Sequence, residues 1–299
     1  MLDRHRDIPL ARPLDLVSTL KPLVHGRGDR TIRLARAEAW IALRTTDGPA
    51  TLRVAHVAPD RARATAWGPG ASAALDHAPA LIGELDDPDA FVAHHPIIRR
   101  LQRTHPGLRL PRAGRVTHVL VPAILEQKVT GTEAFRTYAA LQRAICEPAP
   151  GPADLLLPPD PERLAKLPYH AFHPFGLERR RAEVIRRAAA VADWLEAPND
   201  LAEIARRLRS LPGIGPWTVA EVLRTGFGDP DAVSIGDYHV PNTVAWALAG
   251  EPRAGDERML ELLEPYRGQR GRVQRLLEVG RITAPRYGPR MAPRRIAAI

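Results

Sequence analysis

Cysteine is almost absent from this 299-residue chain, which contains only Cys146. A single cysteine excludes an internal disulfide, a cysteine-ligated zinc site and an iron–sulfur cluster, because each needs several thiols. The sequence also lacks any run of eighteen uncharged apolar residues, and residues 1–6 lack the apolar stretch of a secretory signal. We therefore expect a cytoplasmic protein with no membrane partner.

Lysine is scarce as well, since only Lys21, Lys128 and Lys166 occur. Arginine supplies nearly all of the 43 basic residues, which exceed the 34 acidic ones and give a net charge of +9. A positive balance suits a polyanionic partner, because neutralised phosphates release counterions. The charge favours nucleic acid, although a basic enzyme without such a partner would share it.

The first ninety residues differ in pattern from the rest. Short segments at 39–44, 51–57 and 61–67 are rich in strand-forming residues and are separated by turn sequences. A helical pattern covers 72–85, and the Asp-Asp-Pro-Asp sequence at 86–89 marks a boundary. Residues 1–90 are therefore predicted to form a small α+β domain with an antiparallel sheet.

Apolar residues at three- and four-residue spacing dominate the remainder, which predicts an all-α core over residues 91–281. The fold class is thus mainly α. Residues 282–299 form a basic tail, expected to be a solvated terminus rather than a DNA-contacting arm. The expected helices cover residues 116–125, 131–146, 161–167, 178–195, 201–211, 216–227, 241–248 and 255–263.

The most informative segment reads Leu-Pro-Gly-Ile-Gly-Pro-Trp-Thr at residues 211–218. Two glycines permit a tight turn, and proline is well placed to begin the helix that follows. Amide groups at such a helix start bind a phosphate without regard to base sequence. A plain helix–helix turn is the alternative. The backbone-binding residues predicted here are Pro212, Gly213, Ile214, Gly215 and Thr218.

This hairpin resembles that of the helix-hairpin-helix DNA glycosylases, which carry an essential aspartate some twenty residues later. Asp237, in the string Asp-Tyr-His-Val, matches that aspartate. The resemblance implies that Asp237 is catalytic, either stabilising positive charge on the sugar or activating water as a general base. An aspartate before a helix is ordinarily a cap, which is the alternative.

Position 217 separates subclasses of this family. Relatives that also cut the DNA backbone have a lysine there, whereas this chain has Trp217, which resembles the DNA-3-methyladenine glycosylase II branch. A monofunctional enzyme is therefore expected, with Trp217 in an aromatic base pocket or, alternatively, packed in the core. Tyr238 is a weaker pocket candidate.

The segment at 123–130, Ala-Ile-Leu-Glu-Gln-Lys-Val-Thr, resembles the family's duplex-inserting loop. Lys128 occupies the wedge position, where relatives commonly have leucine or glutamine, and Gln127 is expected beside the flipped nucleotide. An ordinary surface lysine is the alternative. His170 and His173 lack a third metal ligand, so packing or a pocket wall is expected and no metal is predicted.

Together these features predict a monofunctional DNA glycosylase of base excision repair, monomeric and nucleoid-associated, that removes alkylated purines from damaged double-stranded DNA. No cofactor is expected, although a monovalent cation on the hairpin carbonyls is compatible with the sequence. A glycosylase for deaminated or oxidised bases and a catalytically silent DNA-binding protein remain the alternatives.

Overall fold

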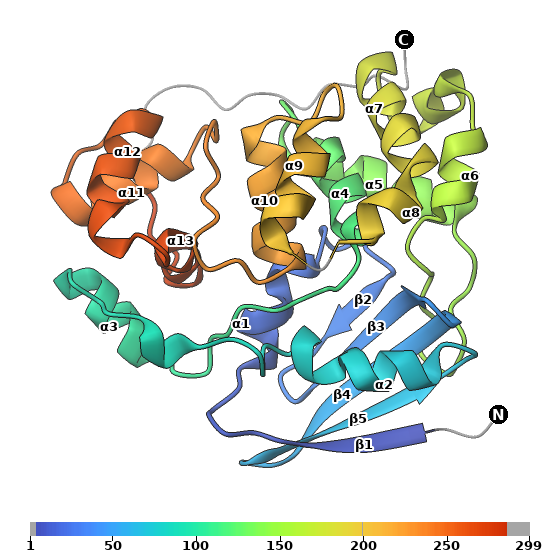
Figure 1. Cartoon of the computed structure of the whole chain (residues 1–299), viewed down its shortest axis with the longest axis horizontal. Helices are drawn as coiled ribbons and strands as arrows, with labels where there is room; N and C mark the ends of the chain where they lie inside the picture. The colour runs from blue at the N-terminus through green and yellow to red at the C-terminus, as the bar shows by residue number, and fades with distance from the viewer. Residues whose placement is uncertain (1–3, 199, 286–299) are drawn as a thin grey trace.

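A computed structural model describes residues 4–198 and 200–285 of the chain. Its N-terminal part contains an antiparallel sheet of five strands in the order β1-β5-β4-β3-β2 (Figure 1). The three predicted strands are confirmed as β3, β4 and β5. The other two lack a period-two pattern: β1 is an exposed edge strand, and β2 has only three residues. The strands are β1 (Arg4–Pro9), β2 (Ile32–Leu34), β3 (Glu38–Thr45), β4 (Gly48–Ala58) and β5 (Arg61–Trp67).

One face of the sheet is covered by α2 (Ala71–Leu81), whose alanines and leucines pack on β1, β4 and β5. The short helix α1 (Leu16–Leu20) completes this apolar cluster. On another part of the sheet, Trp40 and Trp67 stack with ring centroids 5.3 Å apart. The predicted α+β character of the N-terminal region is confirmed.

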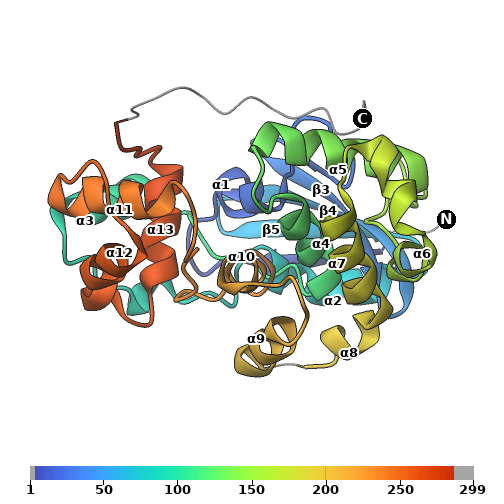
Figure 2. The same ribbon diagram turned by 90° about the horizontal axis from the view of Figure 1, so that it is seen from above.

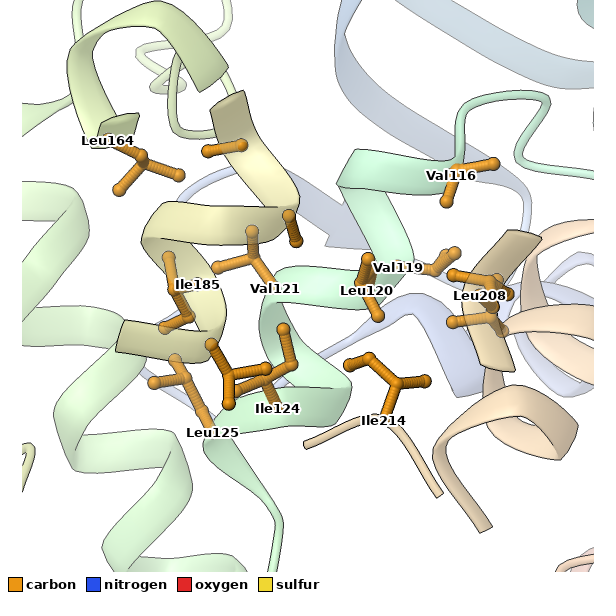
Figure 3. Close-up of a cluster of buried hydrophobic side chains, with 14 of the residues drawn as sticks. Val116, Val119, Leu120, Val121, Ile124, Leu125, Leu164, Ile185, Leu208 and Ile214 are labelled. Atoms are coloured by element: carbon orange, nitrogen blue, oxygen red, sulfur yellow. The ribbon is translucent and has the colours of Figure 1, made fainter. Parts of the chain in front are cut away.

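The first helical group surrounds α4, which lies at its centre (Figures 1 and 3). The sequence of α4 has no polar stripe, so the helix is buried on all sides. Its apolar side chains contact those of α7 and of the hairpin before α10. This group comprises α4 (Val116–Leu125), α5 (Gly131–Ile145), α6 (Pro161–Lys166), η3 (Tyr169–Phe175), α7 (Arg179–Ala190), α8 (Ala192–Glu196), α9 (Leu201–Arg209) and α10 (Pro216–Gly226).

A second helical group lies to one side of the first and has its own apolar cluster (Figures 1 and 2). Its presence was not predicted, since α3 and α13 were missed and a single core was expected. The chain crosses between the groups at residues 105–115 and 227–239. The second group comprises α3 (Pro96–Thr104), α11 (Val240–Ala249), α12 (Asp256–Leu263), η4 (Glu264–Tyr266) and α13 (Arg270–Val279), and a short turn, η2 (Pro88–Ala90), precedes it.

Two details differ from expectation. The helix predicted over 178–195 is interrupted at Val191, whose φ of −117° and ψ of 25° separate α7 from α8. Asp86, in the predicted boundary segment, forms a buried ion pair with Arg272 of α13, so this segment is fixed to the second helical group. Most of the tail at 282–299 lies outside the described residues. Among the helices of residues 4–198 and 200–285, none has the length and apolar character needed to cross a bilayer.

Candidate active site

The segment at 211–215 forms the predicted hairpin between α9 and α10. Ile214 is buried and points toward Leu208 and Leu120 (Figure 3), which anchors the turn to the first helical group. Gly213 has a φ of +97°, and a Cβ placed on it would lie only 2.4 Å from Cγ2 of Val184. Intramolecular packing therefore requires glycine at position 213.

Gly215 differs in both respects. Its φ is −100°, which any residue adopts, and an added Cβ would meet nothing within 4 Å. It is the exposed N-cap of α10, and no side chain of the described residues caps that helix. Nothing within the described fold requires glycine here, whereas close approach of a ligand to the backbone would.

The two glycines provide a matched experiment. Gly213→Ala is expected to lower the free energy of unfolding by about 2 kcal/mol, because it combines positive φ with a clash. Gly215→Ala should change stability by less than about 0.5 kcal/mol but weaken binding of undamaged duplex DNA about tenfold, since its methyl group would meet the phosphate. Urea titration and fluorescence anisotropy measure the two effects. Unchanged DNA binding by Gly215→Ala would contradict a backbone contact here.

Asp237 lies on the loop between the two helical groups and is half-buried. Its Oδ1 accepts hydrogen bonds from the backbone amides of His239 at 2.7 Å and Val240 at 2.9 Å. Its Oδ2 accepts one from the indole Nε1 of Trp217 at 3.1 Å. Three N–H donors therefore fix the carboxylate beside the first turn of α10.

The hydrogen bonds of Asp237 agree with the capping alternative, and its catalytic role stays a prediction. One oxygen bonds the amides that begin α11, as a helix-capping aspartate does. The other oxygen accepts a hydrogen bond from Trp217, two residues after the hairpin, and Asp237 as a whole is half-buried. Trp217 is half-buried, and its polar edge is oriented by Asp237 rather than by the core.

A buried polar network, which the sequence did not predict, holds the Asp237 loop to α10. Ser234 donates its hydroxyl hydrogen to Glu221 of α10, and its amide donates to Oε1 of Gln274 in α13 at 3.1 Å. Arg224 binds Glu221 at 2.9 Å and Glu278 at 3.0 Å. Ser234, three residues before Asp237, is thus hydrogen-bonded to Glu221, four residues after Trp217.

Opposing effects act on the pKa values of the two carboxylates that bind Arg224, of which Glu221 is half-buried and Glu278 is exposed. Burial raises the pKa of Glu221, and Arg224 only partly offsets that effect. Desolvation of the carboxylate acts in the same direction on Glu278, but Arg224 and Arg275 outweigh it and lower the pKa of that group. The Glu221–Arg224 pair, three residues apart on one helix, was the only sequence feature that hinted at this link.

The loop after α4 contacts the hairpin through Gln127. The Nε2 of Gln127 donates to the carbonyl oxygen of Gly213 at 3.0 Å and to Oγ1 of Thr218 at 2.9 Å. Gln127 therefore braces the hairpin, and its place beside a flipped nucleotide stays a prediction. Arg181 is buried and donates to the carbonyl of Leu125, which fixes the end of α4.

Lys128 follows Gln127 and is exposed, with a φ of +55°. A lysine in this left-handed conformation is strained, and such strain is concentrated at functional sites. Figure 1 shows this loop, the hairpin and the Asp237 loop at one edge of the helical region, opposite the sheet. The structure thus brings the predicted wedge, backbone contact and carboxylate together.

The remaining candidates are less defined. Tyr238 is 82% exposed and its ring contacts only that of His239 among the ring pairs of the described residues. The rings of His170 and His173 each contact that of Tyr169 edge-on, and both residues are exposed. Residues 4–198 and 200–285 contain no group of three His, Cys, Asp or Glu side chains placed to hold a metal ion.

Comparison with solved structures defines the fold. The 3-methyladenine DNA-glycosylase from Archaeoglobus fulgidus superposes with a TM-score of 0.78 at 18% identity, covering 92% of this chain and 98% of that protein. The fold is therefore that of the helix-hairpin-helix DNA glycosylases. No family model matches the chain.

Sequence comparison agrees. The chain is 31% identical over 159 residues to the probable bifunctional transcriptional activator/DNA repair enzyme AlkA of Mycobacterium tuberculosis, and 29% identical over 174 residues to DNA-3-methyladenine glycosylase 2 of Escherichia coli. These matches span 50% and 56% of this chain but only 32% and 60% of the two relatives. The chain thus resembles DNA glycosylases of the AlkA type over about half of its own length, and it spans less than two thirds of either relative.

Proposed function

We propose that this protein is a monofunctional DNA glycosylase that flips alkylated purines, of the 3-methyladenine and 7-methylguanine type, out of duplex DNA and hydrolyses their bond to the sugar. The observation that carries the proposal is the fixed carboxylate of Asp237. It accepts a hydrogen bond from Trp217, which lies in the first turn of α10, just after the hairpin, and the start of α10 has no side-chain cap among the described residues. The names of the sequence relatives support the same chemistry. We propose further that it acts as a cytoplasmic, nucleoid-associated monomer.

The carboxylate supplies the chemistry that this reaction needs. Breaking an N-glycosidic bond builds positive charge on the deoxyribose, and a fixed negative group nearby stabilises that charge. At about 4 Å with an effective dielectric constant near 20, the attraction is about 4 kcal/mol, or roughly a thousandfold in rate. Because Asp237 is held by three N–H donors, little reorganisation accompanies this stabilisation. Activation of a water molecule by the same oxygen is the alternative role.

Trp217 recognises the damaged base in this proposal. Its Nε1–H donates a hydrogen bond to Asp237, which supports a position of the indole near the reacting sugar. An alkylated purine is positively charged, so stacking and cation–π attraction on an indole are worth about 1–3 kcal/mol. A charged base also leaves readily, so no acid is needed to protonate it. Tyr238, the next residue after Asp237, is the second pocket residue we propose.

The hairpin carbonyls fit a monovalent cation poorly. The carbonyl oxygen of Gly213 accepts a hydrogen bond from Gln127, and that of Leu211 accepts one from the amide of Ile214. The Pro212 carbonyl oxygen lies 3.4 Å from the positively charged Arg187. A cation would have to share all three oxygens and tolerate a guanidinium group beside it. We therefore assign no step to a cation.

A lesion panel tests the proposal. Duplexes that contain 3-methyladenine, 7-methylguanine, hypoxanthine or uracil are incubated with the protein, and released bases are measured by chromatography. Release of the two methylated purines without strand cleavage is expected, and borohydride should trap no covalent complex because Trp217 replaces the Schiff-base lysine. Release of uracil alone would overturn the substrate assignment. DNA binding without any release would favour a silent binding protein.

A Lys128→Gly variant separates the wedge from folding. Glycine relieves the positive φ, so stability should stay equal or rise by about 1 kcal/mol. Excision from paired lesions should fall about tenfold, because nothing then occupies the space of the extruded base, whereas excision from single strands should hardly change. Thermal unfolding and single-turnover kinetics on the two substrates provide the measurements. An equal loss on both substrates would argue against a wedge.

A further inference from the structure

Helix α7 passes the hairpin and carries two exposed arginines on the side that touches it. Val184 of α7 is buried and faces Gly213, as the 2.4 Å approach of a Cβ at that glycine shows. Arg180 precedes Val184 by four residues and Arg187 follows it by three, so all three lie along one face of the helix. The hairpin therefore lies beside a stripe with an arginine at each end.

The environment of each arginine leaves its guanidinium group at the surface. Arg187 places Nη1 3.4 Å from the carbonyl oxygen of Pro212 while remaining exposed. Arg180 is exposed and, within residues 4–198 and 200–285, has no hydrogen bond or ion pair. The next residue, Arg181, contrasts with both, since it is buried and bound to Glu178 and Leu125. The charge of Arg181 is therefore neutralised within the fold, whereas the positive charges of Arg180 and Arg187 are not paired with an acidic side chain among the described residues.

We infer that Arg180 and Arg187 form a phosphate-binding row that extends the hairpin's contact along the DNA strand. The inference rests on the proposed function and names residues that neither the hairpin motif nor the resemblance assigned. Seven residues of helix rise about 10 Å, so two long arginine side chains at this spacing can reach different phosphates of one strand. Guanidinium forks bind phosphate oxygens in two-point contacts.

The nearby acidic residue does not cancel this row. Glu183 lies between the two arginines in sequence, but its carboxylate is bound to Arg186 at 3.0 Å. Toward the start of α7, Arg179 lies over the ring of Tyr169 at 4.6 Å and adds positive charge. This side of α7 therefore keeps a net positive charge next to an uncapped helix start.

The test is the salt dependence of binding to an undamaged duplex. In an Arg180→Gln/Arg187→Gln variant, the slope of log K against log salt concentration should become shallower by about 0.9 for each lost contact. An Arg36→Gln/Arg61→Gln variant removes the same charge from exposed positions at the sheet and should keep the wild-type slope. An Arg180→Lys/Arg187→Lys variant retains the charge and should keep most of the slope. Equal melting temperatures would verify that all variants fold.

The outcomes separate this inference from the proposed function. If the glutamine variant keeps the wild-type slope while Gly215→Ala weakens binding, the α7 row is overturned and the hairpin contact stands. If the sheet variant loses as much slope as the α7 variant, only overall charge matters and the row is again overturned. If the wild-type protein binds no duplex, both the row and the proposed function fail.

Discussion

An Asp237→Asn variant is expected to excise methylated purines about a thousandfold more slowly than the wild type. Asparagine keeps an oxygen that can accept from the amides of His239 and Val240, so the loop and α11 should still form. What is lost is the negative charge beside the sugar, worth about 4 kcal/mol in the transition state. Single-turnover kinetics with 7-methylguanine in a duplex provide the measurement.

The control for this experiment is a carboxylate that lies close in sequence but outside the loop. Glu257, exposed in the first turn of α12, loses the same charge in Glu257→Gln and should retain activity within about twofold. DNA binding by Asp237→Asn should also be unchanged or tighter, since a negative group near the phosphates is removed. Excision at the wild-type rate by Asp237→Asn would mean that the reaction depends on another residue.

The largest predicted change in stability is that of a His118→Leu variant. Its free energy of unfolding should depend less on acid pH than that of the wild type. His118 of α4 is half-buried beside a cavity of about 40 Å³, and its buried Nε2 atom has no hydrogen-bond partner among the described residues. Burial, with Arg115, Arg44 and His77 nearby, lowers the pKa of His118 from 6.5 to about 3. Between these two values the unfolded chain binds a proton that the folded protein does not.

This difference in bound protons sets the direction in which folding stability changes with pH. As the pH falls from 6.5 toward 3, His118 makes the folded state progressively less stable, by about 3 kcal/mol at pH 4.5. Leucine removes this effect and an unsatisfied buried nitrogen, so the variant should be at least as stable at pH 7 and clearly more stable at pH 4.5. Urea unfolding at both pH values measures it. His5→Leu, at an exposed strand position, should leave the pH dependence unchanged. If the stability of His118→Leu fell between the two pH values as much as that of the wild type, the lowered pKa of His118 would be contradicted.

Much of the site could be predicted because its features are local. The turn at 211–215 depends on glycine conformation, the start of α10 on a proline, and the strands and most helices on short-range periodicity. These preferences act over a few residues, so they can be read from the chain directly. The missed elements differ in this respect. β1 is an exposed edge strand, and α13 buries polar side chains among its apolar ones, so their local patterns are weak. α3 is amphipathic and starts at a proline, so its pattern was present in the chain.

The sequence by itself determined the hairpin, the position of Asp237 relative to it and the absence of a lysine at position 217. Only the tertiary structure decided that Trp217 bonds Asp237, that Gln127 braces the hairpin and that Glu221 holds Ser234. These contacts join residues that are distant in the chain or lie on different elements, and they form only when helices pack. Packing depends on the combined shapes of many side chains, which no local pattern encodes.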